Sequence, residues 1–231
     1  MLLFIIAGLQ KTTLIDFPQK IAAIVFTQGC NFCCGYCHNP EILDFTSKSD
    51  FSTEKFFNFL KSRKGKLDGV VITGGEPTLQ AELYNFIKEI KYLGFLVKLD
   101  TNGSNPQILK KLINDNMLDY IAMDIKAPLE KYSEITNVNV NIDNIRQSIN
   151  LIMKSNVDYE FRTTVLKSQL SYDDFDKIGQ LIRGAKHYYL QKFVPSKILN
   201  TDLKSEKTYT DIEFEKIRGI LQNYIKLISV R

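Results

Sequence analysis

The four cysteines of this 231-residue chain lie between positions 30 and 37, in the run TQGCNFCCGYCHNPE. Three of them, Cys30, Cys34 and Cys37, follow the pattern Cys-x3-Cys-x2-Cys. Soft thiolate sulfur is the ligand type that iron–sulfur chemistry selects, and three thiolates this close together can hold three irons of a 4Fe–4S cube. The fourth iron then has no cysteine, and an open metal position is typical of a catalytic site rather than a closed structural one.

A zinc site that uses all four thiols is the main alternative. It would pair Cys30 with Cys33, and Cys34 with Cys37, as two Cys-x2-Cys units. Zinc sites of this kind normally separate their two pairs by a longer spacer. Because Cys33 and Cys34 are adjacent, their side chains should diverge, and we expect Cys33 to be a free thiol beside a three-cysteine cluster.

Length and composition favour one ordinary globular domain. A chain of 231 residues can bury a core without disulfide staples. Its formal charge of +4 is small for this length and gives no strong case for a nucleic-acid partner. The opening MLLFIIA is short and lacks a basic leading region, and no apolar run approaches the roughly 20 residues of a membrane span. Clustered cysteines indicate a reducing compartment, so we expect a cytoplasmic protein without a membrane partner.

Short segments rich in β-branched and aromatic residues alternate with helical patterns along the chain. The predicted strands span 21–27, 69–73, 95–100, 119–125, 157–166 and 187–194. Such alternation implies right-handed crossovers and a parallel sheet. Six such units fit this length, which predicts an α/β fold, a partial (β/α)6 barrel of the TIM type. We expect a single domain over 1–231, with its core at 18–200 and an added strand or hairpin at residues 2–17.

Helical signals lie between and after these strands. Apolar residues recur at helical spacing in two early segments, 79–93 and 106–115, and in two later ones, 142–153 and 175–182. Asn105 is a candidate cap for the second of them, because a proline follows it. Thr210 and Glu213 have the spacing of a capping box. This signal predicts a C-terminal helix over 210–229.

Polar and glycine-rich runs come where the predicted strands end. They are the cysteine loop, TGGEPT (73–78), DTNG (100–103), MDIKAP (123–128) and PSK (195–197). In barrels of this type, catalytic groups collect at the carboxyl ends of the strands. Convergence of these runs on one rim therefore predicts a single active site.

The run GGEPT has two interpretations. Gly74 and Gly75 allow the backbone to approach a ligand closely, and Glu76 can accept hydrogen bonds from an ammonium group. A simple turn from strand to helix, with Glu76 near the helix start, accounts for the same letters. The position of the run, on the strand after a cysteine loop, favours the ligand interpretation.

Four charged residues on the later strands are further candidates. Asp124 and Lys126 are two residues apart, so both point to the same side of a strand. They are either ligand contacts or a structural ion pair at the rim, and Asp100 allows the same two interpretations. Arg162 lies within an otherwise apolar strand, and its guanidinium fork matches carboxylates.

The two histidines, His38 and His187, carry less information. His38 follows a cluster cysteine and can be a ligand, an acid–base group or a hydrogen-bonding loop residue, and the last is the commonest. With only two histidines, a Ser–His–Asp hydrolase is unattractive. No phosphate-binding loop of the Walker type is present.

These motifs together resemble the radical S-adenosylmethionine (SAM) superfamily. Within it, the N-terminal run IAGLQKTTLIDFPQKIAAIVFTQGCNF and the runs YCHNPE, GGEPTLQ, DTNG, MDIKAP and FRTTV resemble the anaerobic ribonucleoside-triphosphate reductase activating proteins. Those proteins are related to pyruvate formate-lyase activating enzyme. The resemblance covers most of the chain, and the cysteine pattern with GGEP is its most specific part.

The resemblance implies a set of cofactors and contacts. One 4Fe–4S cluster would be held by Cys30, Cys34 and Cys37, with SAM on the free iron. Tyr36 would lie by the adenine, close to the backbone of Cys37 and His38. The run Gly74, Gly75 and Glu76 would meet the SAM amino group. The polar residues near SAM would be Asp100, Asp124, Lys126 and Arg162.

The resemblance also implies an activity. A radical SAM oxidoreductase of this branch reductively cleaves SAM to a 5′-deoxyadenosyl radical, which removes hydrogen from a backbone glycine of a partner enzyme. The expected partner is anaerobic ribonucleotide reductase, with a low-potential donor such as flavodoxin or ferredoxin. The alternatives are a radical SAM enzyme acting on a small molecule, such as 7-carboxy-7-deazaguanine synthase, and a metal-binding module without activity.

Three positions depart from the family pattern. Cys33 stands where relatives often have a basic residue, and Gly35 stands where a proline is common. Neither change removes a cluster ligand. A histidine occurs near the end of strand 6 in pyruvate formate-lyase activators, and Lys197 is the nearest match here. The role of that histidine is therefore not assigned to Lys197.

Overall fold

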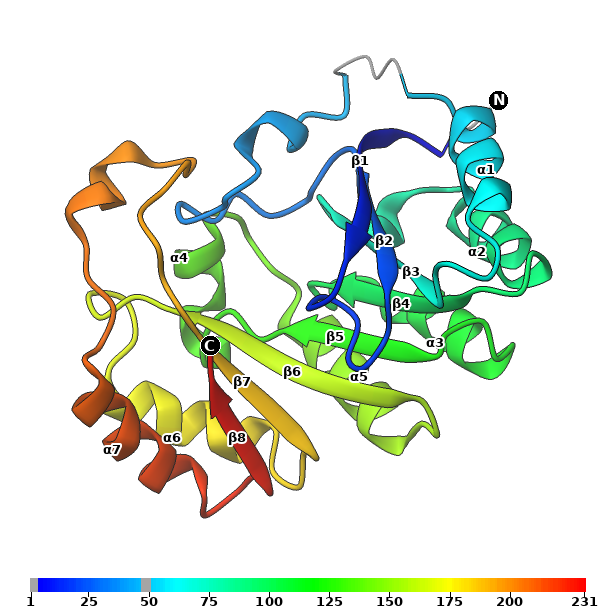
Figure 1. The fold of residues 1–231 in the computed structure, drawn as a ribbon. Helices are drawn as coiled ribbons and strands as arrows, with labels where there is room; N and C mark the ends of the chain where they lie inside the picture. The colour runs from blue at the N-terminus through cyan, green and yellow to red at the C-terminus, as the bar shows by residue number, and fades with distance from the viewer. Residues whose placement is uncertain (1–3, 47–50) are drawn as a thin grey trace.

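The computed structural model describes residues 4–46 and 51–231 (Figure 1). Within these ranges one sheet contains eight strands, and strands that follow one another in sequence are neighbours in space. The strands are β1 (Ile6–Thr13), β2 (Ala22–Thr27), β3 (Gly69–Gly74), β4 (Leu96–Thr101), β5 (Tyr120–Asp124), β6 (Asp158–Val165), β7 (His187–Lys192) and β8 (Leu227–Val230). β1 pairs with β2 antiparallel, and every later pair is parallel.

The predicted parallel strands and N-terminal hairpin are confirmed, and β2 to β7 match the six predicted segments. The start of the segment predicted for the hairpin, residues 2–3, lies outside the described residues. Among the described residues the sheet is open, because β1 and β8 each pair with only one neighbouring strand. This open arrangement is the partial barrel that the alternation predicts.

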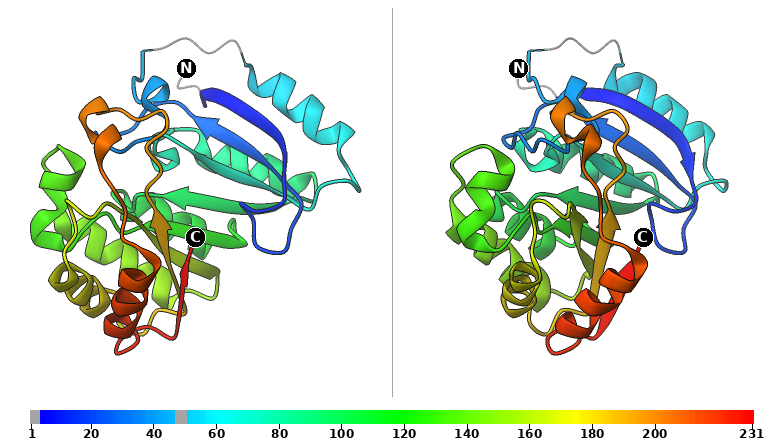
Figure 2. Two further views of the ribbon diagram at one scale, coloured as in Figure 1. Left: turned by 60° about the vertical axis from the view of Figure 1, so that its left-hand side comes forward. Right: turned by 90° about the vertical axis from the view of Figure 1, so that its left-hand side faces the viewer.

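Helices connect the strands along the outer side of the curved sheet (Figures 1 and 2). They are α1 (Thr53–Ser62), α2 (Leu83–Tyr92), α3 (Pro106–Asn114), α4 (Tyr132–Thr136), α5 (Ile142–Lys154), α6 (Tyr172–Leu181) and α7 (Asp211–Leu221). The described residues also form four short 3-10 turns, η1 (Pro40–Ile42), η2 (Pro77–Leu79), η3 (Leu129–Lys131) and η4 (Thr201–Ser205). Within the described ranges, no helix has the length and apolar character needed to cross a membrane.

Side-chain caps explain where several helices begin. The capping box of Thr210 and Glu213 is present at α7, as predicted, and Ser171 forms a second one at α6. Asn105 occupies the predicted cap position of α3 but makes no capping bond. Its Nδ2 instead donates to the Thr78 carbonyl over 2.9 Å. Asn105 thus ties the start of α3 to the loop after β3.

Two helix predictions need correction. The C-terminal helix was expected over 210–229, but α7 ends at Leu221 and Leu227–Val230 form β8. Pairing with the open edge of β7 satisfies backbone groups there, and this overrides the helical spacing of the apolar residues. The helix expected over 79–93 begins only at Leu83, after the turn η2. Two helices, α1 and α4, have no counterpart in the sequence prediction.

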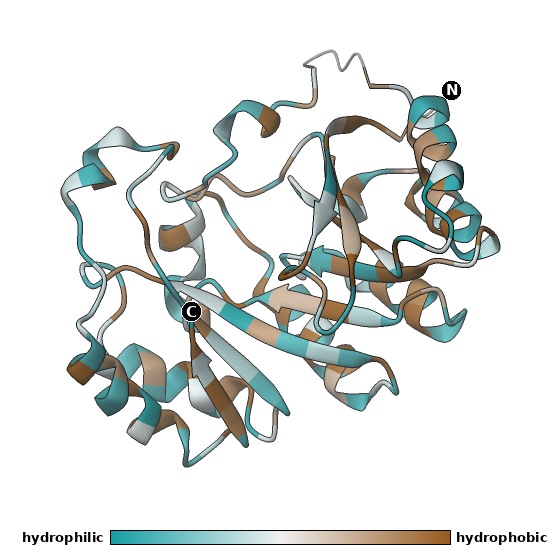
Figure 3. Cartoon of the chain, in the orientation of Figure 1, coloured by the Kyte–Doolittle hydropathy of each residue, from teal (hydrophilic) through white to brown (hydrophobic). Residues whose placement is uncertain are grey.

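Apolar side chains form two clusters on opposite faces of the sheet. The larger cluster lies between sheet and helices and includes Val97, Leu99, Ile121 and Phe161. The smaller cluster combines Phe17, Ala22, Ile24 and Val71, and Phe26, Leu96 and Tyr120 pack against it. Figure 3 shows hydrophobic and hydrophilic segments side by side along the strands. The inner face is therefore apolar at one end of the strands and free for polar groups at the other.

Candidate functional site

A cavity of about 340 Å³ lies at the carboxyl ends of the strands. Every residue predicted for the site lines it: Cys30, Cys34, Tyr36, Cys37, His38, Gly74, Gly75, Glu76, Asp100, Asp124, Lys126 and Arg162. Further lining residues were not predicted and include Phe32, Asn39, Asn102, Thr164, Gln191 and Lys192. The runs after β2, β3, β4 and β5 thus converge on one site, whereas the PSK run after β7 is not among the residues around the cavity.

The cysteine loop is closed by backbone hydrogen bonds near its two ends. Gly29 N donates to the Ile42 carbonyl over 2.7 Å, and Cys30 N donates to the Leu43 carbonyl over 3.1 Å. Inside the loop, Cys37 N donates to the Cys34 carbonyl over 2.9 Å. These bonds hold the three thiols of the Cys-x3-Cys-x2-Cys pattern toward the cavity.

Cys33 lies apart from these three thiols. Its side chain is exposed and does not line the cavity, whereas Cys34 is buried in the cavity wall. The Cys33 backbone is held by α4, because its N donates to the Thr136 carbonyl over 2.9 Å and its carbonyl accepts from Asn137 Nδ2 over 3.0 Å. The expected divergence of Cys33 and Cys34 is therefore present, and the four-thiol arrangement of the zinc alternative is not formed.

The three cavity thiols are neutral in the metal-free chain. Burial raises the pKa of Cys30 to about 12, and the Phe32 N–H, 3.4 Å from Cys30 Sγ, opposes only part of that rise. Burial likewise raises the pKa of Cys34 and of Cys37. Because thiolates rather than thiols ligate metals, ligand binding here must release protons to the solvent.

The donor set fits a three-cysteine iron–sulfur cluster. Three soft donors share one cavity, and the fourth cysteine is directed elsewhere, which leaves one iron of a cube without a protein thiolate. Across residues 4–46 and 51–231, no group of three His, Cys, Asp or Glu side chains is arranged to hold a single metal ion. The residues present thus match the cluster that the spacing predicts.

Gly74 and Gly75 are required by the neighbouring cysteine loop. Gly74 has a φ of +113°, and a Cβ there would come within 2.3 Å of Thr27 N. A Cβ on Gly75 would come within 1.9 Å of the Gly29 carbonyl oxygen. In this tight crossing, Gly75 N donates to the Thr27 carbonyl and Glu76 N to the Gly29 carbonyl. The close approach expected for a ligand is therefore made first by protein backbone.

Glu76 is fully buried, and both of its carboxylate oxygens already accept hydrogen bonds. Oε1 accepts from Thr78 N over 3.1 Å, from Thr78 Oγ1 over 2.6 Å and from Thr101 Oγ1 over 2.7 Å. Oε2 accepts from Asn102 N over 2.6 Å. Burial raises the pKa of Glu76, and these bonds oppose the rise only in part. Glu76 caps the turn η2, as the alternative interpretation of GGEPT expects, and ties it to the end of β4.

A chain of five alternating charges crosses the inner face of β4, β5 and β6. Asp100 accepts from Lys98 Nζ over 2.7 Å and from Arg162 Nη1 over 3.0 Å. Asp124 accepts from Arg162 Nε over 2.8 Å and from Lys126 Nζ over 3.0 Å. Three cations thus face two carboxylates. With Lys98 below the cavity included, the chain of charges carries one surplus positive charge, which suits an anionic ligand group.

All members of this chain whose pKa shifts are clear stay charged at neutral pH. Burial alone would raise the pKa of Asp124, but Arg162 and Lys126 outweigh it and hold that pKa well below its usual range. The pKa of Asp100 is lowered in the same way by Arg162 and Lys98. Burial would lower the pKa of Lys126, but the Asp124 carboxylate raises it well above the ordinary lysine value.

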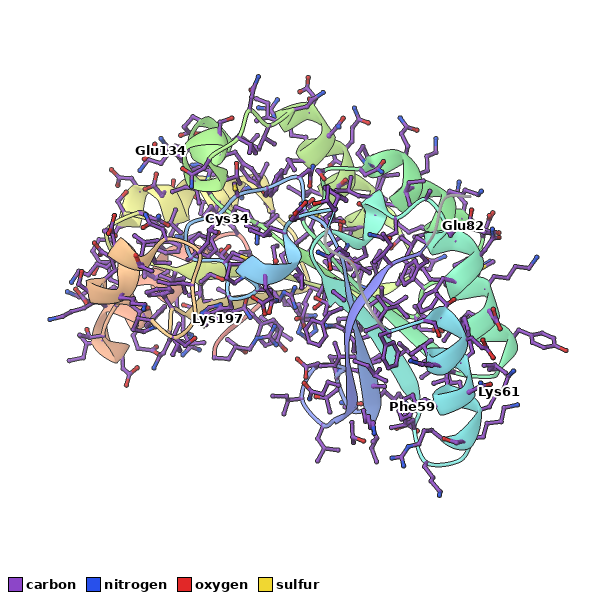
Figure 4. All side chains as sticks on the ribbon, turned by 90° about the horizontal axis from the view of Figure 1, so that it is seen from above. Cys34, Phe59, Lys61, Glu82, Glu134 and Lys197 are labelled. Carbon is purple, nitrogen blue, oxygen red and sulfur yellow. The ribbon has the colours of Figure 1, made fainter. Side chains whose placement is uncertain are left out.

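His38 and Lys197 lie at the edge of the site. His38 Nε2 is 3.0 Å from the Val194 carbonyl oxygen, so its imidazole forms a loop hydrogen bond. Lys197 is 65% exposed, forms an ion pair with Glu41 over 2.9 Å and does not line the cavity. In Figure 4, Cys34 and Lys197 lie on the opposite side of the molecule from Lys61 and Glu82.

Lys98 and Asn102 are two residues of this region to which the sequence analysis gave no role of their own. Lys98 is only 2% exposed and supports Asp100 from below the cavity. A lysine within the apolar run FLVKLD was the available signal. Asn102 Nδ2 lies 4.0 Å from Cys30 Sγ and donates to Asn31 Oδ1 over 2.9 Å. The run DTNG (100–103) was expected at this rim, whereas the contacts of Asn102 with the cysteine loop depend on tertiary packing.

The chain resembles proteins of known families over most of its length. Residues 24–182 match the model of the radical SAM superfamily. The chain is 31% identical over 232 residues to a Methanocaldococcus jannaschii protein assigned as a glycyl-radical enzyme activating enzyme, with 98% of this chain and 95% of that protein covered. It is 25% identical to the pyruvate formate-lyase-activating enzyme of Clostridium pasteurianum, with 96% of each covered.

Solved structures share the fold. A domain of pyruvate formate-lyase-activating enzyme from Bacteroides vulgatus superposes with a TM-score of 0.58 at 15% identity, covering 71% of this chain and 98% of that one. SuiB of Streptococcus suis, bound to S-adenosylmethionine, gives a TM-score of 0.64 at 15% identity, covering 88% and 48%. With the superfamily model and the full-length relative in agreement with the cysteine loop, this chain belongs to the radical SAM superfamily and, within it, to the glycyl-radical-enzyme activating enzymes.

Proposed function

We propose that this radical SAM activase generates the glycyl radical of an anaerobic ribonucleoside-triphosphate reductase. It does so with a 4Fe–4S cluster on Cys30, Cys34 and Cys37 and with SAM as the second cofactor. The observation that carries the proposal is the cavity, which is lined by three thiols and by the ion-paired residues Asp100, Asp124, Lys126 and Arg162, in a protein related end to end to glycyl-radical activases.

The cofactors supply the hard chemistry, namely one-electron cleavage of the SAM sulfonium bond to methionine and a 5′-deoxyadenosyl radical that takes hydrogen from a partner glycine. The protein binds, orients and shields these groups. Cys30, Cys34 and Cys37 would hold the cluster as thiolates, and SAM would bind beside it in the same cavity. Tyr36, Cys37 and His38 line the cavity and would lie beside the adenine of SAM.

The charge chain orients the polar parts of SAM. Lys126 and Arg162 line the cavity. Together with Lys98, which lies below the cavity, they carry one positive charge more than Asp100 and Asp124 neutralise, so the chain of charges can attract a carboxylate. Asp124 remains ionised and can accept from a ribose hydroxyl. Asp100 keeps Arg162 in place from the opposite side. Charged groups fixed in this way need little reorganisation when the ligand arrives.

The GGE run supports the SAM amino group mainly through its backbone. Glu76 already accepts four hydrogen bonds, so its carboxylate fixes the loops after β3 and β4. Gly74 and Gly75 then bring main-chain groups to the cavity wall beside the cysteine loop. The amino group of SAM is met by this fixed run.

Ribonucleotide reductase is proposed as the partner enzyme for two reasons, the N-terminal sequence and the small number of cysteines. The run IAGLQKTTLIDFPQK resembles the single-domain activating proteins of that enzyme, and its Phe17 packs on the inner face of the sheet. Only four cysteines are present, so no auxiliary cluster motif accompanies the first. The electron comes from a low-potential donor such as flavodoxin or ferredoxin.

The test is a direct activation assay. The protein is purified and reconstituted with iron and sulfide without oxygen, given SAM and dithionite, and mixed with inactive anaerobic ribonucleotide reductase. A glycyl-radical doublet in electron paramagnetic resonance spectra is expected. The matched control is a reductase whose radical glycine is replaced by alanine, which should give no doublet.

Three outcomes would redirect the proposal. Cleavage of SAM with a radical on pyruvate formate-lyase but none on the reductase would reassign the partner. Turnover of a small molecule such as the deazaguanine precursor would favour the other class of radical SAM enzyme. Absence of methionine release by reduced, iron-loaded protein would exclude the activity altogether.

A further inference from the structure

Thr164 on β6 and Gln191 on β7 form a polar pair in the cavity that the proposed contacts with SAM do not use. The two residues are direct partners in the parallel pairing of these neighbouring strands, and both line the cavity (Figure 1). Within residues 4–46 and 51–231, neither side chain makes a hydrogen bond to another protein group. The charged residues beside them are ion-paired with one another. Uncharged donors and acceptors are thus left for a ligand.

This pair lies near the opening of the cavity rather than at its base. Thr164 follows Arg162 by two residues on the same face of β6, so it lies about 7 Å nearer the carboxyl end of the strand. Of the described residues that line the cavity, His38 and Lys192 are exposed. Lys192 directly follows Gln191, so the cavity reaches the surface beside the pair.

Other uncharged polar side chains of the cavity without a protein partner lie on its opposite flank. They are Tyr36 and Asn39 in the cysteine loop and Thr73 near the end of β3. In the sheet, β4 and β5 separate β2 and β3 from β6 and β7, and these two middle strands carry both carboxylates of the charge chain. Under the proposed function SAM binds along the cysteine loop and this chain of charges. The pair on β6 and β7 remains for the second substrate.

The backbone at Gln191 is held from both sides. β6 pairs with one edge of β7. At the other edge, Arg231 N donates to the Leu190 carbonyl over 2.9 Å, and Lys192 N donates to the Arg231 carbonyl over 2.8 Å. The Arg231 guanidinium also lies 4.1 Å from the ring centre of Tyr189, two residues before Gln191. A side chain on a strand fixed in this way needs little reorganisation when a ligand binds.

The chemistry of the pair matches a peptide backbone. A glutamine amide carries donors and an acceptor in one plane, as a peptide group does, and a threonine hydroxyl can both donate and accept. An enzyme that acts on a backbone glycine finds no side chain to hold at the reacting residue. It therefore has to bind the N–H and C=O groups of the chain around that glycine. Neutral side chains can pair with these groups without the cost of burying a charge.

We propose that Thr164 and Gln191 bind the backbone of the glycine segment of the partner enzyme and hold it at the opening of the cavity. Gln191 Nε2 donates to a peptide carbonyl, Gln191 Oε1 accepts from a peptide N–H, and Thr164 Oγ1 bonds an adjoining peptide group. This inference rests on the proposed function, because it needs a peptide substrate. It assigns positioning residues for that substrate, whichever glycyl-radical enzyme supplies it.

The test measures activation as a function of the concentration of the partner enzyme. Wild type, Gln191→Met and Thr164→Val are reconstituted with iron and sulfide without oxygen and given saturating SAM and dithionite. The glycyl-radical doublet formed on inactive anaerobic ribonucleotide reductase is followed by electron paramagnetic resonance. Each variant loses hydrogen bonds between neutral groups, so the apparent KM for the reductase should rise about three- to tenfold. A wild-type KM in Gln191→Met would overturn the proposal, and a wild-type KM in Thr164→Val would remove Thr164 from it.

Matched variants separate recognition from damage to the fold. Thr164→Ser keeps the hydroxyl and should keep the wild-type KM. Gln107→Met removes an exposed amide on α3, outside the cavity lining, and should also keep it. If Gln191→Met holds no iron, Gln191→Glu keeps the shape and the acceptor but loses the donor. It should raise the KM, and a wild-type KM there would contradict the proposal.

Contact of the pair with SAM has a different signature. Gln191→Met and Thr164→Val would then weaken SAM binding in calorimetry and leave the KM for the reductase unchanged at saturating SAM, and the proposal would fail. Wild-type protein that gives no doublet on the reductase or on pyruvate formate-lyase would refute the proposed function itself. A doublet on either enzyme, with the same KM in wild type and Gln191→Met, would refute only this inference.

Discussion

Adjacent residues of this chain lie in opposite environments, and the contrast is sharpest on β6. Phe161 is fully buried in the apolar cluster under the helices, whereas Arg162 turns inward to join two carboxylates at the cavity. Cys33 and Cys34 repeat the contrast in a loop, one exposed and one in the cavity wall. On β6, a residue that stabilises the core is therefore followed directly by a residue of the cavity. A shift of the strand register by one residue would exchange the faces on which Phe161 and Arg162 lie.

The largest effect is expected at Cys34. Cys34→Ala removes one of three cluster ligands, so iron content and SAM cleavage should fall to background. Its neighbour provides the matched control, because Cys33→Ala changes a thiol outside the cavity and should keep both. Iron and sulfide analysis with a methionine-release assay checks the pair. Loss of the cluster in Cys33→Ala would revive the four-thiol arrangement.

The next largest effects are expected at Phe161 and Arg162 on β6, where one substitution tests each face of the sheet. Phe161→Ala leaves a cavity in the core and should lower the free energy of unfolding by about 3–5 kcal/mol. Arg162→Met leaves two buried carboxylates poorly paired and should cost about 3–5 kcal/mol. Only Arg162→Met should also weaken SAM binding by the protein that remains folded. Denaturant melts and calorimetry distinguish them, and equal SAM affinity in both variants would remove Arg162 from the site.

Lys126→Ala should give an intermediate effect confined to the ligand. The variant loses one cation of the cavity wall and keeps all three thiols. SAM affinity should fall roughly tenfold, a change of about 1.4 kcal/mol, because a single charge-assisted contact is lost. Iron content should stay unchanged. Calorimetry that finds wild-type SAM affinity would exclude Lys126 as a contact.

Low pH should reduce the free energy of unfolding, because it protonates the ion-paired carboxylates on the inner face of the sheet. The pKa of Asp124 is lower in the folded than in the unfolded chain, so it contributes stability above about pH 4 that is lost as the pH falls further. Asp124→Asn removes this contribution. In denaturant melts of the iron-free chain between about pH 4 and pH 2, the variant should lose stability less steeply than wild type. Parallel curves would show that Asp124 has no such linkage.

Lys197 should give the smallest effect. Its ion pair with Glu41 is exposed on both sides, and such pairs contribute about 0–1 kcal/mol. Lys197→Ala should therefore keep the stability, iron content and SAM affinity of the wild type. A clear loss of SAM affinity would mean that this lysine takes the place of the family histidine after all.

Much of this arrangement was predictable, because it depends on local patterns. The short β-branched runs gave six parallel strands, and the ends of those strands gave the site. The helical spacing of apolar residues misled at the C-terminus, where Leu227–Val230 pair with β7. Residues 227–230 form a strand because the edge of β7 is available for pairing, and this depends on the tertiary structure rather than on local sequence.

The sequence analysis of the site was incomplete for a similar reason. Gly74, Gly75 and Glu76 line the cavity, as predicted, but the sequence did not show that they also contact the neighbouring loops. Lys98 was not predicted, because a strand pattern indicates the face of the sheet on which a side chain lies but not its ion-pair partner, here Asp100. Spacing places a residue at the rim, but it does not show which hydrogen bonds are already made there.

The close packing of Gly75 against Gly29 links the sequence of the cysteine loop to the sequence of the turn after β3. Since one added methyl group would overlap the Gly29 carbonyl oxygen, the metal-bearing loop and the turn that follows β3 have to vary together. Libraries of variants in which only positions 74–76 are randomised should therefore yield mostly protein that lacks the iron–sulfur cluster and its colour. Productive variants are expected only when residues 28–30 are randomised in the same step.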